Sequence, residues 1–390
     1  MKLENSVGAV TAVPLLDVNR GNRELRDEIL AALTDVVDSG KFLHGPQVAE
    51  LEASVASLCE SKHAIGCGSG SDALLLALMA LNVGPGDEVI LPSFTFFATA
   101  SCIERVGAKI VFADIDPHTY NISPEHVATL ITRNTKAIIA VHLFGQCAAM
   151  DRLQAIAQRH KVAIIEDAAQ AIGASYANVP ACGWDTIGCL SFYPTKNLGG
   201  FGDGGMLTCQ DDMTAARLRL LANHGMQPRY HHREVGINSR LDTLQAAVLN
   251  VKMTRLQQYQ RARQANAARY RMLFAASDLD EMCRMPAQDP QAVHVYNQFS
   301  VRVADGQRDM LRQHLQKQNV GCEIYYPIPL HLQQCFRHLG YRTGALPETE
   351  RAAAEILHLP IYPELTQDEQ QAVVESVASY YATGYARRAA

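Results

Sequence analysis

The chain has 390 residues, 48% of them hydrophobic, and its 35 Lys and Arg against 40 Asp and Glu give a formal net charge of −5. This near balance, without a long run of one sign, excludes the electrostatic footprint of a nucleic-acid-binding protein and of one that binds an anionic membrane. The length exceeds one ordinary domain of about 100–150 residues, so a large domain and a smaller one are expected.

The first residues lack the basic start, apolar core and cleavage site of a signal peptide, and no stretch stays apolar for the roughly 20 residues that cross a bilayer. Ten cysteines form neither a CxxC pair nor the cluster of a metal site. We therefore expect a cytoplasmic protein with reduced, mostly buried thiols and no metal.

The first 60 residues predict two helices, at 23–39 and 47–58, joined by a loop. From 60 to 210, short apolar β-prone runs alternate with segments whose apolar residues recur at helical spacing. The runs are 63–66, 88–91, 109–112, 137–141 and 162–165, and the helical segments are 72–81, 95–106, 124–131 and 150–160. Strict alternation of strand and helix predicts a mainly parallel sheet covered by helices on both faces.

The second half of the chain lacks this regular alternation of strand and helix. A short strand runs into Lys196, another follows a glycine-rich turn at 203–209, and a long helix is expected at 242–274. The last hundred residues combine a strand at 298–303, a helix at 308–318 and Pro-rich turns, which predicts a small α+β domain. The expected division is a large domain at 15–250 and a small C-terminal domain at 251–385.

The first feature that carries chemistry is the turn Gly66–Asp72, which follows a strand and opens a helix. Backbone N–H groups at a helix start, with the hydroxyls of Ser69 and Ser71 beside them, form a ready site for an anion such as phosphate. The same residues would also form a tight turn with a serine N-cap. Taken alone, this turn leaves both interpretations open.

The second feature is a carboxylate at the end of a predicted strand, in the segment Glu166–Gln170. In open α/β sheets ligands bind beyond the carboxyl ends of the strands, so Asp167 lies where a cofactor would lie. A helix cap or an exposed carboxylate is the alternative for this residue considered alone.

The third feature is a lysine on a constrained loop, with Pro194 before Lys196 and Gly199 and Gly200 after it. Burial in such a loop would lower the pKa of the amine and free it for a Schiff base. An ordinary surface lysine is the alternative.

The fourth feature is the polar turn Asn238–Asp242 before the long helix, which by itself indicates only an Asp N-cap with a neighbouring ion pair. The first three features combine, because pyridoxal phosphate (PLP) needs an anion site for its phosphate, a carboxylate for its pyridine nitrogen and a lysine for its aldehyde. All three occur in one predicted α/β domain.

These residues resemble the sugar aminotransferase family named after DegT, DnrJ, EryC and StrS, whose members are PLP enzymes of the aspartate-aminotransferase fold group. The most specific segments are Ser191–Gly199, Glu166–Gln170 and Asn238–Ala247. The resemblance is greatest to nucleotide-sugar 3-aminotransferases. It implies PLP-dependent transferase fold type I, with a mainly parallel seven-stranded sheet between helices and a smaller α+β C-terminal domain.

By this resemblance, Lys196 carries PLP as a Schiff base, Asp167 bonds its pyridine nitrogen and Gln170 lies near its phenolic oxygen. Phe96 would stack on the ring, although a plain core role is the alternative for a phenylalanine. The resemblance assigns the phosphate to Ser69, Gly70, Ser71 and Ser191, and Ser191 would otherwise bond only backbone. Asn238 would reach the phosphate in the partner subunit, which implies a homodimer with shared active sites.

Contacts with the nucleotide sugar are also implied by the resemblance, for Phe42, Thr195, Arg240 and His331. Structural roles remain open for two of them, because His331 would also serve as a satisfied buried histidine and Arg240 as an ion-pair partner.

The implied reaction moves an amino group from L-glutamate to a UDP- or dTDP-linked keto-hexose at C3, with Lys196 as the proton carrier in both half-reactions. One alternative is a PLP-dependent sugar dehydratase, whose relatives have histidine in place of the lysine. Another is a non-catalytic regulatory protein of the same fold, which the intact set of Lys196, Asp167 and Gln170 disfavours.

Overall fold

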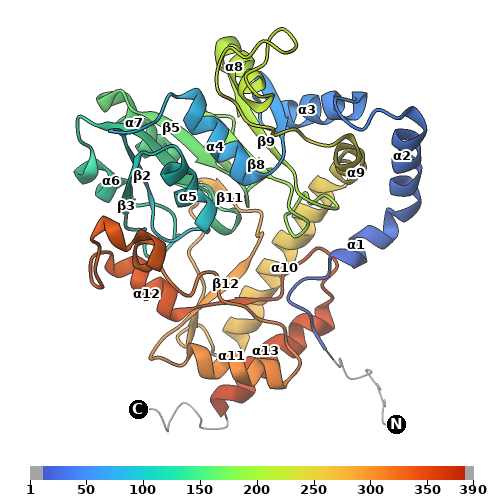
Figure 1. Cartoon of the computed structure of the whole chain (residues 1–390). Coiled ribbons are helices and arrows are strands. Elements are labelled where there is room, and N and C mark those ends of the chain that lie inside the picture. The colour runs from blue at the N-terminus through green and yellow to red at the C-terminus, as the bar shows by residue number, and fades with distance from the viewer. Residues whose placement is uncertain (1–11, 383–390) are drawn as a thin grey trace.

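A computed structural model describes residues 12–382 of the chain. A central sheet lies between two layers of helices, and a smaller group of C-terminal elements packs below it (Figure 1). The N-terminal helices α1 (Val18–Glu24), α2 (Arg26–Ser39) and α3 (Pro46–Leu58) lead into the sheet. Within residues 12–382 no helix is long and apolar enough to span a membrane.

The central sheet has seven strands in the order β1-β9-β8-β5-β4-β2-β3. The strands are β1 (His63–Cys67), β2 (Glu88–Pro92), β3 (Lys109–Ala113), β4 (Thr135–Val141), β5 (Ala163–Asp167), β8 (Ile187–Ser191) and β9 (Gly205–Cys209). Neighbours are parallel except that β9 is antiparallel to both β1 and β8. This confirms the predicted mainly parallel seven-stranded sheet of an α/β fold.

The sheet is buried on both faces, which explains why its strands are almost continuously apolar. Along β2, Val89 and Leu91 belong to the hydrophobic core on one face, whereas Ile90 belongs to the core on the other. Successive side chains of a strand point to opposite faces, so a sheet covered on both sides selects apolar residues at every position.

Helices cover each face as the alternating pattern predicts. The crossover helices are α4 (Gly70–Ala80), α5 (Phe97–Arg105), α6 (Pro124–Leu130) and α7 (Met150–His160), and α8 (Asp212–Ala222) follows the last strand, β9. The core that contains Val89 is completed by α4, α5 and α8, and the core that contains Ile90 by α3, α6 and α7. Each helix begins near the carboxyl end of a strand or its following loop, which brings several helix starts to one edge of the sheet.

The long helix expected at 242–274 is two helices, α9 (Thr243–Met253) and α10 (Leu256–Ala276). Thr254 and Arg255 separate them, and neither Gly nor Pro stands at the break. The first helix packs on α2 and α3, whereas the second packs on the C-terminal helix α13 (Gln367–Ala382). The break therefore follows from tertiary packing, and the expected division at 250/251 falls inside α9.

The C-terminal elements form a second, smaller layered unit. Its sheet has the order β10-β12-β13, with β10 (Cys283–Arg284), β12 (Phe299–Val303) and β13 (Ile356–Leu359). The helices are α11 (Arg308–Lys317), α12 (Pro347–Glu355) and α13. Short strands β6 (Ser175–Tyr176), β7 (Val179–Pro180) and β11 (Ala292–Val293) form a separate three-stranded sheet.

A buried arginine fastens α10 to this smaller unit. Arg263 is 4% exposed, and its Nη1 donates to the carbonyl oxygens of Tyr296 and Ile361, both at 3.0 Å. Burial lowers the pKa of this guanidinium to about 10. Its direct partners are backbone carbonyls, and the carboxylate of Glu364 also favours its charge without a direct ion pair in the described part of the chain.

Candidate active site

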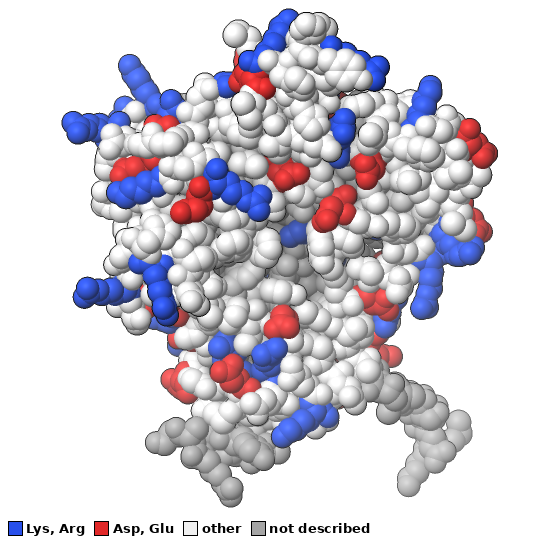
Figure 2. All heavy atoms as spheres, in the orientation of Figure 1, with Lys and Arg blue, Asp and Glu red and all other residues white. Residues whose placement is uncertain are grey.

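A cavity of about 610 Å³ lies at the carboxyl ends of three adjacent parallel strands. Val141, Asp167 and Ser191 are the last residues of β4, β5 and β8, and all three line it. Figure 2 shows a hollow near the middle of the face that it displays. This is the edge at which open α/β sheets bind their ligands.

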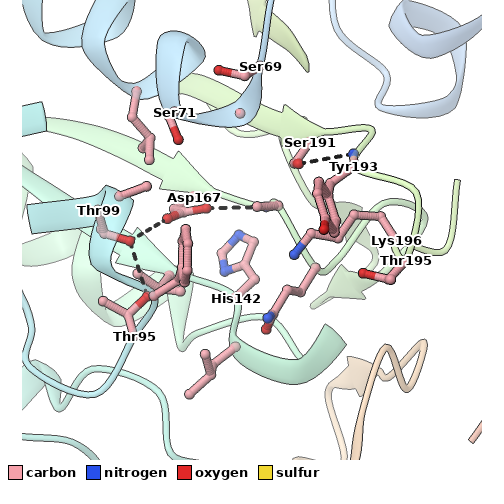
Figure 3. Close-up of a pocket in the computed structure, with 18 of the residues that line it drawn as sticks. Ser69, Ser71, Thr95, Thr99, His142, Asp167, Ser191, Tyr193, Thr195 and Lys196 are labelled. Carbon is pink, nitrogen blue, oxygen red and sulfur yellow. Dashed lines mark hydrogen bonds between the residues drawn. The ribbon is translucent and has the colours of Figure 1, made fainter. Parts of the chain in front are cut away.

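Lys196 points into this cavity from the loop that follows β8 (Figure 3). The loop is held by hydrogen bonds from Lys196 N to Tyr193 O and from Gly200 N to Phe192 O. Burial lowers the pKa of the Lys196 ammonium from 10.5 to about 8, while the negative charge of Asp167 acts in the opposite direction. A substantial fraction of free amine is therefore present near neutral to mildly alkaline pH.

Asp167 faces the same cavity and is 5% exposed. Its Oδ2 accepts a hydrogen bond of 2.8 Å from the Thr99 hydroxyl, and its Oδ1 accepts one of 3.3 Å from the backbone N–H of Ala169. Burial raises the pKa of this carboxyl, and these two hydrogen bonds oppose the rise. Asp167 and Lys196 both line the cavity, and within residues 12–382 no ion pair joins them.

The start of α4 supplies a cradle for an anion. Ser69 is the N-cap of this helix, its Oγ accepting from Asp72 N at 3.1 Å, and Gly70 and Ser71 also line the cavity. A Cβ on Gly205 of the adjacent β9 would lie 2.4 Å from the Ser69 carbonyl, so only glycine permits this close approach. Exposed N–H groups at the helix start make the cradle suited to a phosphate.

Four more of the predicted contacts line the cavity. Ser191 lies beside the cradle, because a Cβ on Gly70 would come within 2.7 Å of its Cβ. Gln170 is 9% exposed, and its Oε1 accepts from Phe144 N at 2.7 Å. Thr195 lines the cavity next to Lys196, and Phe96 lies at the entrance with 57% of its surface exposed. The cavity thus brings together every predicted cofactor contact except Asn238.

Asn238, Arg240 and Phe42 do not line the cavity of their own chain. Asn238 is exposed and forms a β-bridge with Asn223, and the side chain of Arg240 also lies near Asn223, at 3.5 Å. Phe42 is 49% exposed, and its carbonyl accepts from Thr243 N in the turn that starts α9. These predicted contacts therefore stand outside the cavity on the surface around the start of α9.

His331 lies behind the cavity wall instead of lining it. It is 1% exposed, with Nδ1 at 2.7 Å from Ser93 Oγ and Nε2 at 3.1 Å from Glu350 Oε1. Burial lowers the pKa of its imidazole. Because both ring nitrogens are engaged inside the protein, the arrangement is that of a satisfied buried histidine, and the sugar contact of His331 stays a prediction.

Several lining residues were not among the predicted contacts. They are Thr95, Thr99, His142, Tyr193, Asp203, Gln298, Tyr325 and Tyr326. Thr99 and His142 follow β2 and β4, so the rule that ligands bind at strand ends would have indicated them. Tyr325, Tyr326 and Gln298 come from the C-terminal unit, and no local pattern places them there.

The loop of Lys196 is also joined to the C-terminal unit. Asn197 Nδ2 donates to Val295 O at 3.0 Å, and Asn297 Nδ2 donates to Asn197 Oδ1 at 3.0 Å. The residue next to the lysine is therefore held by the segment that leads into β12.

Comparison with known proteins assigns the chain to a family. The profile of the DegT/DnrJ/EryC1/StrS aminotransferase family matches residues 23–378. The chain belongs to this family. The match includes the cradle, Asp167, Lys196 and the Asn238–Asp242 turn, as the resemblance implied, and members of the family are PLP-dependent.

Individual relatives cover almost the whole chain. It is 47% identical to a "Pleiotropic regulatory protein" of Geobacillus stearothermophilus, over 95% of this chain and 98% of that protein. It is 42% identical to a UDP-N-acetyl-3-dehydro-alpha-D-glucosamine 3-aminotransferase of Acidithiobacillus ferrooxidans, over 92% and 95% of the two chains. The solved structure of S. venezuelae DesV in complex with a ketimine intermediate matches with a TM-score of 0.91 and 40% identity, over 95% and 98%.

The residues present fit the cofactor of the family. The cavity holds an anion cradle at a helix start, a buried carboxylate and a lysine whose pKa is lowered to about 8. These are the three groups that the phosphate, the pyridine nitrogen and the aldehyde of PLP require. In this member of the DegT/DnrJ/EryC1/StrS family, Ser69 to Ser71, Asp167 and Lys196 would hold PLP.

Proposed function

We propose that this chain is an aminotransferase that moves an amino group from L-glutamate to C3 of a UDP- or dTDP-linked keto-hexose. The single observation that carries the proposal is the placement of Lys196, with a pKa near 8, opposite Asp167 in one cavity. The nucleotide-sugar part is supported by relatives such as the Acidithiobacillus 3-aminotransferase at 42% identity.

Bound PLP supplies an aldehyde that carries the amino group and a ring that accepts electrons. Lys196 Nζ would move a proton to and from the carbon that gains or loses the amino group, which is efficient for an amine whose pKa is lowered to about 8, close to neutrality. Asp167 would accept a hydrogen bond from the ring N–H, and the start of α4 would hold the phosphate. Gln170 provides a side-chain amide near the phenolic oxygen.

We also propose a homodimer with shared active sites. Phe42, Asn238 and Arg240 stand outside the cavity of their own chain, around the start of α9. A second copy that packed against this surface would receive these side chains at the mouth of its own cavity. Such an isologous arrangement would complete both sites at once.

Two further parts of the proposal concern organisation and location. The large PLP-binding domain spans 15–250 and the small domain 251–385, of which 383–385 lie outside the described residues. The protein works in the cytoplasm, a location supported by ten free cysteines, nine of them buried.

The regulatory alternative has one observation in its favour, the name of the Geobacillus relative. A regulator without turnover has no need for a lysine with a lowered pKa facing a buried carboxylate, whereas a transaminase does. The presence of both Lys196 and Asp167 therefore favours a catalytic function over a regulatory one.

The test is a panel of acceptors supplied to the purified, PLP-loaded protein with L-glutamate as donor. We expect 2-oxoglutarate to form with 3-keto hexoses linked to UDP or dTDP, and product NMR to place nitrogen on C3. The Lys196→Ala variant is the control for background transfer. Amination of an ordinary keto acid but of no nucleotide sugar would remove the sugar assignment, and absence of turnover with every acceptor would favour the regulatory reading.

A further inference from the structure

Two buried threonines form a chain of hydrogen bonds that ends on Asp167 (Figure 3). Thr95 is 3% exposed and lies in the turn after β2, and Thr99 is 0% exposed and lies in the first turn of α5. The hydroxyl oxygens of the two residues are 3.1 Å apart. Thr99 Oγ1 is 2.8 Å from Asp167 Oδ2.

The chain has a fixed direction when Asp167 is ionised. A carboxylate only accepts hydrogen bonds, so the single hydroxyl proton of Thr99 lies between Thr99 and Asp167. The hydrogen bond between the two threonines must then use the proton of Thr95. The order of donation is therefore Thr95 to Thr99 to Asp167.

The hydrogen bond that Thr99 donates differs from the usual one of a threonine in a helix. A threonine inside a helix commonly donates to a backbone carbonyl of the preceding turn. Thr99 instead donates to a side chain on another strand, β5, which lies two strands away from β2 in the sheet. The contact joins the start of α5 to the carboxylate that faces the cavity.

The remaining surroundings of Asp167 leave room for a ring nitrogen. Its second hydrogen-bond donor is Ala169 N at 3.3 Å, so two donors occupy a group with about four acceptor positions. Among the titratable groups that interact with Asp167, Lys196 and His142 favour its negative charge, whereas burial disfavours it. The others are the buried thiols of Cys102 and Cys189 and the buried phenol of Tyr326. Thr99 makes the strongest opposing contact.

We propose that Thr99 is a positioning residue, which holds Asp167 ionised and oriented toward the pyridine nitrogen of PLP, and that Thr95 sets the direction of the Thr99 hydroxyl. The proposal rests on the assignment of Asp167 to the ring nitrogen. It gives the short segment 95–99 two tasks, because Phe96 of the same segment is the predicted stacking residue.

The test compares variants of the full-length protein by the equilibrium affinity of the PLP-free form for PLP and by the pH profile of that affinity. Thr99→Val keeps the shape and removes the hydroxyl, and we expect it to weaken PLP binding about 10- to 100-fold, the range for losing a hydrogen bond to a charged group. Thr99→Ser retains the hydroxyl and should stay within about threefold of the parent. Thr95→Val should have an intermediate effect.

The pH profile separates positioning from a merely structural role. The Thr99 hydrogen bond lowers the pKa of Asp167, so its loss raises that pKa. As pH falls, PLP affinity should therefore begin to decline at a higher pH in Thr99→Val than in the parent. A structural role would lower the unfolding midpoint and leave the profile unmoved.

A matched control is Thr208→Val, which removes another fully buried threonine hydroxyl, one that donates to Cys182 O at 3.0 Å and does not line the cavity. It should leave PLP affinity and its pH profile unchanged. If Thr99→Val does not fold, Thr95→Val decides, because an unshifted profile overturns the proposal and a shifted one supports it.

Two further outcomes would overturn the proposal: parental PLP affinity with an unshifted profile in Thr99→Val, or a Thr99→Ser variant as impaired as Thr99→Val. The sugar assignment fails separately. If the variants behave as expected but no nucleotide sugar is aminated, the role of Thr99 stands and the proposed substrate does not.

Discussion

The part of the proposed site inside one chain and the part on its outer surface are built in different ways. Lys196, Asp167 and the α4 cradle converge inside one chain, at the ends of neighbouring strands. Phe42, Asn238 and Arg240 lie outside the cavity of their own chain. The difference teaches that one chain encloses most of the groups proposed for PLP, whereas the proposed contribution of a second subunit depends on a surface around the start of α9.

The largest expected effect concerns the interior half. Lys196→Ala removes the only lysine that lines the cavity among the described residues, and turnover should fall by about three to four orders of magnitude. Steady-state kinetics with a nucleotide keto-sugar measures the loss. Lys62→Ala, which changes an exposed lysine paired with Asp212, is the control. Retention of more than a tenth of parental turnover in Lys196→Ala would refute the assignment.

The outward-facing half is tested by complementation between subunits. Asn238→Asp places a negative charge where the partner's phosphate would lie, and PLP affinity should fall about 100-fold. Asn134→Asp, on an exposed loop, is the matched control.

Mixing the Lys196→Ala and Asn238→Asp variants, at a PLP concentration that saturates only the parental site, gives the sharper result. A mixed dimer of Lys196→Ala with Asn238→Asp contains one site with both residues intact, provided that the sites are shared. Random exchange of equal amounts should restore about a quarter of parental activity. No recovery after verified exchange would show that each chain builds its site alone.

A smaller, graded effect follows from the pKa of Lys196. Because the amine must be unprotonated to react, the initial rate at which the PLP-free protein takes up PLP should rise about tenfold per pH unit and level off above pH 8. Stopped-flow absorbance measures it.

The same lowered pKa predicts the sign of a stability change. The folded protein releases the proton near pH 8 and the unfolded chain near 10.5, so the free energy of unfolding of the PLP-free form should rise with pH between these values. Denaturant titrations at several pH values measure it, and Lys196→Met should remove this part of the slope. An initial rate of PLP uptake that keeps rising up to pH 10 would contradict the lowered pKa of Lys196.

The smallest expected effect concerns the cradle. Ser69→Ala removes the N-cap bond to Asp72 N and should cost about 1 kcal/mol of unfolding free energy. Urea unfolding of the PLP-free protein is the measurement. Ser69→Asn, an equally good cap, should restore the stability, and an unchanged midpoint in Ser69→Ala would mean that the cap contributes nothing.

The central sheet was predictable because its strands are buried on both faces and its helices on one. The alternating apolar runs from 63 to 209 match β1 to β9 of the central sheet closely. The break at Thr254 was not predictable, since no Gly or Pro marks it and packing on two different partners causes it. Nor were the two-residue strands, such as β6, which carry too few residues for any periodicity.

The residues of the site likewise include some that the sequence predicts and some that it does not. Asp167 follows an apolar strand and Lys196 a constrained loop, so both could be predicted to face the strand ends, whereas their chemical roles remain predictions. Tyr325 and Tyr326 reach the cavity only because the C-terminal unit packs against the sheet. His331 shows the reverse case, because partners distant in sequence, Ser93 and Glu350, hold it away from the cavity.

The hydrogen bond of Arg263 to the segment before β12 connects the C-terminal unit to the loop of Lys196. Arg263 donates to the carbonyl of Tyr296, the residue before Asn297. The side chain of Asn297 in turn donates to that of Asn197, the residue after Lys196. A rotation of the C-terminal unit would therefore pull on the lysine loop through two hydrogen bonds. Movement of the C-terminal unit and the position of the Lys196 amine should therefore be coupled.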